Sequence, residues 1–195
     1  KQEFIEIYTS LKREETRDWL RKEAVGISDR EIDHRLNRYG LNPCAEICGH
    51  NFACNLAEIH LNLLAESDKD TIRKAFQVAA LNACRQLTHR FPNSELQYSR
   101  ELDPIVGISV TGLFDFFVQK FGKKYLDWWA SDRPVFLGTN NRAIAKAFRE
   151  EEIQWLCKFR SWAEEAVFEF CDRHGLKRPN RFTTVQPAGT KSLLT

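Results

Sequence analysis

Long apolar runs are missing from this chain. The most apolar stretch, Pro104 to Val118, is short and contains Asp115, and the first residues, KQEFIEIYTSLKREE, are strongly charged. A membrane-spanning helix needs about 20 mostly apolar residues, and an export signal needs an apolar core near the N-terminus. We therefore expect no membrane partner and a cytoplasmic location.

A basic surface stripe is missing too. Lys and Arg total 29 against 27 acidic residues, and the two signs are interspersed, so we expect no nucleic-acid partner. No low-complexity run or internal repeat is present. A hydrophobic content of 43%, with 14 Phe and 5 Trp in 195 residues, is typical of one globular domain or of a large segment of a bigger protein.

The six cysteines are unevenly placed. Cys44, Cys48 and Cys54 cluster, and the others stand singly in helical patterns. This spacing favours a cytosolic protein with a reactive or metal-binding cluster over a disulfide framework. The single cysteines are expected to pack as small hydrophobes: Cys84, Cys157 and Cys171.

Residues 1–38 form a charged segment with apolar residues at helical spacing, which predicts a helical lead-in. Within it, Ser28 to Glu31 resembles a capping box that begins a short helix. From Tyr39 to Phe52 the pattern changes to Gly, Asn, Pro and Cys, which is typical of a loop. The following CNLAEIHLNLL predicts a strand.

The rest of the chain alternates helices with short strands. We predict a helix from Asp68 to His89, a strand from Ile105 to Val110 that leads into a helix toward Phe121, and a long helix from Asn141 to His174 that stops at Gly175. RFTTV predicts a last strand, followed by a Pro-Ala-Gly turn and a helix start. The pattern indicates an α/β protein whose strands need partners from elsewhere. An aromatic run is assigned to the core: Phe114, Phe116, Phe117 and Phe121.

The loop Asn42-Pro43-Cys44-Ala45-Glu46 carries an amide, a thiol and a carboxylate at alternating positions. Alternating side chains of an extended segment project to the same side. All three groups can therefore face one substrate, which suits hydrogen-atom and proton transfer.

This loop, followed by Cys-Asn-Leu-Ala-Glu at Cys54 to Glu58, resembles the active-site loop of ribonucleotide reductases. Two later blocks are similar to the adenosylcobalamin-dependent, monomeric class: GISVTGLFDFF from Gly107 to Phe117, and QPAGTKS from Gln186 to Ser192. The resemblance implies a ten-stranded α/β barrel with the active-site cysteine on a central loop. Residues 39–195 would be a helix-rich part of that catalytic barrel, and flanking segments of the same enzyme would complete it.

The resemblance also implies roles for single residues. Cys44 would be the thiyl radical that takes the 3′ hydrogen of a ribonucleoside triphosphate, Glu46 the base at the 3′-hydroxyl, and Asn42 a hydrogen-bond partner of the substrate. Cys54 would be one half of a redox pair that a thioredoxin-like or dithiol reductant regenerates, with its partner on an earlier strand absent from this sequence. Adenosylcobalamin would generate the radical, through contacts expected outside this chain.

The Pro-Ala-Gly turn is a candidate phosphate site, because a helix start presents unpaired N–H groups and a favourable dipole. By resemblance, five consecutive residues hold the substrate phosphates: Ala188, Gly189, Thr190, Lys191 and Ser192. An ordinary capped helix entry would give the same local pattern.

Two other functions remain open. Cys44, Cys48, His50 and Cys54 together supply soft or borderline ligands for zinc or an iron–sulfur cluster, although the second tight pair of a typical zinc site is missing. The chain is alternatively a non-catalytic interaction module derived from the reductase family.

Overall fold

The structure is a computed structural model. It describes residues 52–131 and 142–187, Gly189, and short pieces nearer the N-terminus at 18, 21–22, 28–32, 40–41 and 48–49.

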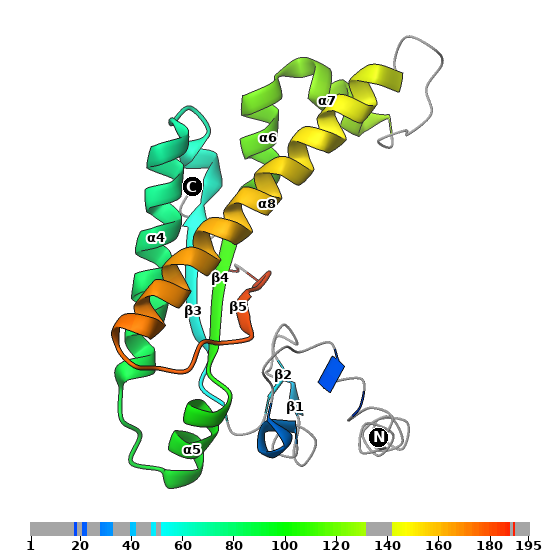
Figure 1. The fold of residues 1–195 in the computed structure, drawn as a ribbon. Helices are drawn as coiled ribbons and strands as arrows, with labels where there is room; N and C mark the ends of the chain where they lie inside the picture. Colours follow the sequence, from blue (N-terminus) through cyan, green and yellow to red (C-terminus); the bar gives the residue numbers. More distant parts are fainter. Residues whose placement is uncertain are drawn as a thin grey trace.

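A sheet of three parallel strands lies at the centre, in the order β3 (Asn55–His60), β4 (Ile105–Thr111) and β5 (Arg181–Thr183) (Figure 1). The six residues of β3 pair in unbroken register with β4, from Asn55 beside Val106 to His60 beside Thr111. β5 pairs with β4 through Arg181 beside Ile105 and Thr183 beside Ile108. Nearer the N-terminus, β1 (Gly40–Leu41) and β2 (Cys48–Gly49) form a separate antiparallel ladder.

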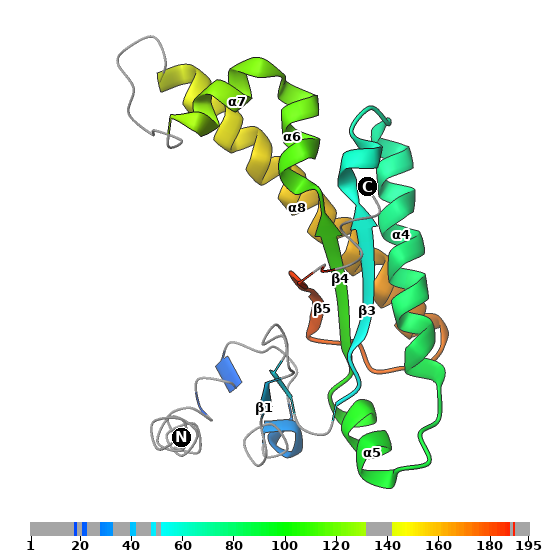
Figure 2. The same ribbon diagram turned by 180° about the vertical axis from the view of Figure 1, so that it is seen from behind.

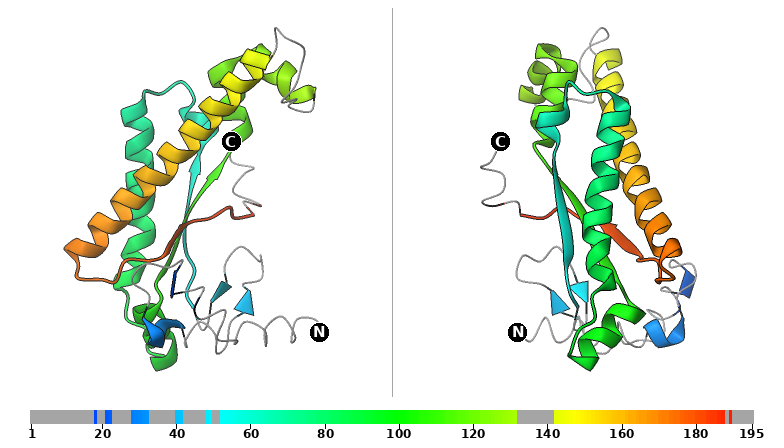
Figure 3. Two further views of the ribbon diagram at one scale, coloured as in Figure 1. Left: turned by 45° about the vertical axis from the view of Figure 1, so that its right-hand side comes forward. Right: turned by 90° about the vertical axis from the view of Figure 1, so that its left-hand side faces the viewer.

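Two long helices, α4 (Lys69–Arg85) and α8 (Arg142–Arg173), cover the same face of this sheet (Figure 3). α4 begins at Asp68, whose Oδ1 accepts from the Thr71 N–H at 2.7 Å and so satisfies an otherwise unpaired donor. Phe76 of α4 is 2% exposed and stacks on Phe159 of α8, with ring centroids 4.9 Å apart. Burial of such an aromatic side chain stabilises the fold by roughly 1.5–3 kcal/mol.

The short helices lie at the two ends of the strands. α6 (Leu113–Phe121) and α7 (Lys123–Ala130) lie beyond the carboxyl ends of β3 and β4, and α5 (Ser94–Leu102) lies at their amino ends (Figure 2). Two 3-10 helices, η1 (Leu61–Leu64) and η2 (Gln86–Thr88), follow β3 and α4. The buried Tyr125 of α7 ties this end to α8, because its hydroxyl donates to Glu152 Oε1 at 2.5 Å.

The predicted α/β class is confirmed as a mixed, helix-rich fold with a small parallel sheet. The predicted strands after residue 53 and the three predicted helices between Asp68 and His174 are present, but residues 61–64 of the first predicted strand are a 3-10 helix. The helix start predicted after the Pro-Ala-Gly turn lies outside the described residues. Helices α5 and α7 were not predicted. The ten-stranded barrel stays a prediction.

Two core assignments are wrong. Phe114 is 41% exposed and packs edge-to-face against Trp129 on the surface, whereas Phe116 and Phe117 are buried as expected. Cys157 is exposed on α8. Both residues lie on helix faces turned away from the sheet, and only the packing direction of each helix decides this.

The N-terminal lead-in lies almost wholly outside the described residues. Residues 29–32 are helical, and the Glu31 N–H donates to Ser28 Oγ at 3.2 Å, as the capping box predicts. The buried Glu31 carboxylate accepts from Lys177 and from Asn180. These bonds attach the short helix to the segment that precedes β5.

Candidate functional site

The predicted site residues are only partly described. Cys54 and Gly189 are described, and the others lie outside the described residues: Asn42, Cys44, Glu46, Ala188, Thr190, Lys191 and Ser192. The same holds for Cys44 and His50 of the alternative metal site, and for the side chain of Cys48. The structure therefore describes strands β3, β4 and β5, which adjoin the predicted site segments in the sequence, and not most of the site residues themselves.

Cys54 lies immediately before β3 and is half-buried. The next residue, Asn55, is 3% exposed, and its Nδ2 donates to the Ile105 carbonyl at 3.0 Å. This bond joins the start of β3 to the start of β4. The thiol of Cys54 is thus attached to the amino end of a rigid strand pair.

The sheet face opposite the helices is polar. Ala57 and Ile59 of β3, and Ile108 of β4, belong to the core beneath α4 and α8. Because side chains alternate along a strand, the intervening residues face the other way, and the parallel register puts Glu58 beside Ser109 there. Among the described helices, α4 and α8 cover only the first face (Figure 3).

The segment after β5 adds an amide to this face. Gln186 is 8% exposed, and its N–H donates to Oγ of the fully buried Ser109 at 3.2 Å. Within the described residues, no acceptor contacts the buried Nε2 of Gln186. Both carboxylate oxygens of Glu58 are buried as well. We call Glu58, Ser109 and Gln186 the polar face.

Gly107 lets the strands approach closely beside the polar face. A Cβ at this position would lie 2.5 Å from Leu56 Cδ2 and 2.8 Å from Thr184 Cγ2, well inside van der Waals contact. The Thr184 N–H donates to the Ile108 carbonyl at 3.2 Å, which continues the pairing beyond β5. Because Gly107 has no side chain, the segment from Thr184 to Gln186 can lie this close to β4.

Gly189 comes three residues after Gln186 in the sequence. It is exposed, its φ is +38°, and no atom of the described residues lies within 4 Å of the position that a Cβ would occupy. A glycine with open space around it lets a ligand approach the backbone. Cys54 lies at the level of Ile105 and Gln186 at the level of Ser109, four residues or about 13 Å further along the strand direction.

Sequence reasoning missed the polar face, although a signal for it was present. Strands of a parallel sheet buried on both faces are nearly all apolar, so Glu58 within NLAEIH and Ser109 within IVGISVT are unusual. Gln186 has no comparable signal, because its burial depends on how the segment after β5 packs on β4.

Comparison with known proteins finds a distant similarity to a reductase. No protein-family model matches the chain. The chain is 28% identical over 174 residues to the adenosylcobalamin-dependent ribonucleoside-triphosphate reductase of Lacticaseibacillus paracasei. The aligned region covers 86% of this chain and 22% of that protein, so the chain spans about a fifth of its relative. The two proteins are distant homologues over this region.

The described helices include none whose length and apolar character would let it cross a membrane.

Proposed function

We propose that this chain is part of the catalytic subunit of a ribonucleotide reductase, an oxidoreductase that converts ribonucleoside triphosphates to 2′-deoxyribonucleotides through a cysteine thiyl radical. The observation that carries the proposal is the homology over 86% of the chain, which agrees with the three sequence blocks at 42–58, 107–117 and 186–192.

Cys44 is the residue that reacts. Sulfur and carbon bind hydrogen with comparable strength, so a thiyl radical removes the 3′ hydrogen of the ribose and later returns it. Glu46 takes the proton of the 3′-hydroxyl while the 2′-hydroxyl accepts a proton from the thiol pair that includes Cys54 and leaves as water, and this kind of general base contributes about 10²–10⁴ in rate. Asn42 hydrogen-bonds the substrate, and Cys54 supplies an electron as one member of a thiol pair that a dithiol reductant regenerates.

The described residues support this assignment in two ways. Cys54 is held at the amino end of β3, and Gln186, which precedes the exposed Gly189, lies about 13 Å further along the strand direction. A substrate with its sugar at one end and its phosphates at the other can extend across such a separation. The turn from Ala188 to Ser192 then binds the phosphates through backbone N–H groups and the hydroxyls of Thr190 and Ser192.

Adenosylcobalamin, specified in the name of the relative, would supply the radical that is passed to Cys44. Two hollows among the described residues measure about 320 and 270 Å³, and each is too small for a cobalamin. Neither hollow fits this group, and no step here is derived through it.

The test replaces Cys44 in the full-length gene product. The protein is incubated with adenosylcobalamin, a dithiol reductant and ribonucleoside triphosphates, and deoxyribonucleotide is measured by chromatography. We expect multiple turnovers from the parent protein and none from Cys44→Ser, because an alkoxyl radical is a poor reversible hydrogen carrier. Glu46→Gln is expected to lower kcat by about 10²–10⁴ and to keep substrate binding.

Cys157→Ser is the matched control, because Cys157 is an exposed cysteine of α8 outside the proposed site and its loss should leave turnover unchanged. Multiple turnover by Cys44→Ser would contradict the proposal. A parent protein that binds ribonucleotides without reducing them would indicate the non-catalytic module, and stoichiometric zinc or iron in the purified protein would indicate the metal site.

A further inference from the structure

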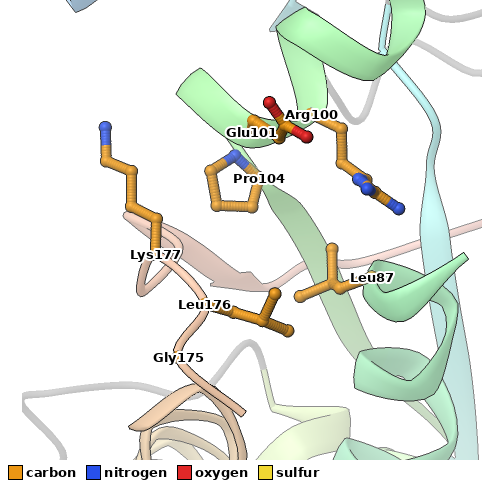
Figure 4. A pocket seen from close by; sticks show the side chains of 7 residues that line it. All are labelled: Leu87, Arg100, Glu101, Pro104, Gly175, Leu176 and Lys177. Atoms are coloured by element: carbon orange, nitrogen blue, oxygen red, sulfur yellow. The ribbon is translucent and has the colours of Figure 1, made fainter. Parts of the chain in front are cut away.

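The larger of the two hollows mentioned above lies away from the proposed active site, at the amino ends of β4 and β5. It measures about 320 Å³, within the range of small-molecule pockets. Its walls come from α5, from η2 and from the segment between α8 and β5 (Figure 4). Seven residues line it: Leu87, Arg100, Glu101, Pro104, Gly175, Leu176 and Lys177.

Arg100 is the unusual member of this lining. It is 9% exposed, yet within the described residues it makes no ion pair, and its buried Nη1 contacts no acceptor. Its guanidinium carbon lies 5.3 Å from the centre of the Phe91 ring. A buried guanidinium N–H without an acceptor is costly, because arginine stays charged and this donor loses its water.

The other two charged residues that line the hollow, Lys177 and Glu101, bond to groups other than Arg100. Lys177 Nζ donates to the Leu102 carbonyl at 2.6 Å and to Glu31, so its charge is already compensated. Glu101 accepts from Gln97 Nε2 at 2.5 Å and makes no hydrogen bond to Arg100.

The electrostatic environment agrees with this geometry. Burial lowers the pKa of Arg100, Glu101 partly offsets this effect by raising that pKa, and the nearby Arg90 lowers it again. The group nevertheless remains a cation at neutral pH. An oxyanion in the hollow would provide the acceptors that Arg100 lacks.

We propose that this hollow binds a small organic oxyanion, a phosphate or carboxylate on an apolar body, with the anionic group at Arg100 and the apolar body between Leu87, Leu176 and Pro104. Arg presents its N–H donors in a fork that matches both phosphate and carboxylate oxygens. Figure 4 shows Arg100 and Leu87 on one side of the hollow and Lys177 on the other, with Leu176 between them.

The site does not depend on the proposed reductase function. Pro104 directly precedes β4, whereas Gln186, which precedes the candidate phosphate turn in the sequence, bonds to Ser109 in the second half of β4. A ligand here should therefore bind without competing with ribonucleotides.

The test uses phenyl phosphate, benzoate and inorganic phosphate as probes. Each is titrated into the purified full-length protein by isothermal calorimetry, with and without saturating ribonucleoside triphosphate. We expect saturable binding of phenyl phosphate or benzoate, tighter than that of inorganic phosphate because the apolar walls contribute. Which of the two organic probes binds more tightly identifies the headgroup.

Arg100→Gln should weaken binding by about tenfold or more, since it removes a charge-assisted hydrogen-bond pair. Arg100→Lys keeps the charge and the aliphatic stem, so it tests the site even if the Gln variant folds poorly; we expect an intermediate loss. The matched control is Arg90→Gln, an exposed neighbouring cation, and should change the affinity by less than about threefold.

The proposal is overturned by absence of saturable binding at millimolar probe, by equal affinities in the parent and both Arg100 variants, or by displacement of the probe by ribonucleotide. The proposal is supported if the added probe raises the melting temperature of the parent protein and does not raise that of Arg100→Gln.

Discussion

Gly107→Ala tests how tightly the strands pack beside the polar face. The added methyl carbon would lie 2.5 Å from Leu56 Cδ2 and 2.8 Å from Thr184 Cγ2, against a normal carbon–carbon contact of about 3.5–4.0 Å. Leu56 can give way by rotating its flexible end. Thr184 cannot do so easily, because it is β-branched and its N–H is bonded to the Ile108 carbonyl.

The expected cost is that of overpacking a close-fitted interior, about 1–3 kcal/mol of unfolding free energy. Urea denaturation followed by circular dichroism measures it, and the slope with denaturant should be unchanged because the exposed surface is the same. If the proposed phosphate turn is correct, the displaced segment from Thr184 to Gln186 should also raise the KM for ribonucleotide.

A double-mutant cycle with Leu56→Ala separates this steric effect from a general loss of strand stability. Leu56→Ala removes the closer of the two contacting atoms, so Gly107→Ala should cost at least about 0.5 kcal/mol less in the Leu56→Ala background than alone. An unchanged or higher stability for Gly107→Ala, or strictly additive variants, would refute the described approach of the strands.

Two further predictions concern the helices. The Asp68 carboxylate caps α4, and the hydrogen bonds that it accepts from Thr71 lower its pKa; the stabilisation is therefore full above the unfolded-state value of about 3.9 and is lost as the pH falls through the lower folded value. The difference in urea midpoint between the parent protein and Asp68→Ala should hold from about pH 7 to about pH 5 and shrink below about pH 4, whereas a pH-independent difference would exclude the carboxylate cap. In thiol mapping by iodoacetamide and mass spectrometry, exposed Cys157 should be labelled in the native protein. Cys84 and Cys171 should react only after unfolding, because both are fully buried and a hydrogen bond with the Cys171 thiol, together with burial, raises the pKa of Cys84; equal native labelling rates would show that α4 and α8 do not pack as described.

Local sequence signals predicted most of the long elements. Asp68 is an N-cap residue in both sequence and structure, Gly175 has a φ of +62° just after α8, and the β-branched run from Ile105 became β4. Each signal acts through the backbone of its own segment, so it can be read without knowing what packs nearby. The short polar helix α5 was missed despite its Asn93 cap, because nine residues with few apolar positions give little periodicity.

For the candidate site, too, the sequence indicated the local motifs and not their arrangement in space. The motif around Cys44 and the turn around Gly189 are contiguous in sequence, so the sequence alone indicated their chemistry and the family resemblance. Their mutual arrangement is not contiguous, and the roles of Asn42, Cys44 and Glu46 stay predictions.

Only the tertiary structure decided which side chains share a surface. Glu58 meets Ser109 because β3 and β4 pair in parallel, and Ser109 meets Gln186 because the segment after β5 packs on β4. Arg100 lines a hollow with Leu176 because α5 and the segment between α8 and β5 lie together at the amino ends of the strands. Residues so far apart in the chain have no local preference for one another; long-range burial of the sheet and its two covering helices brings them together.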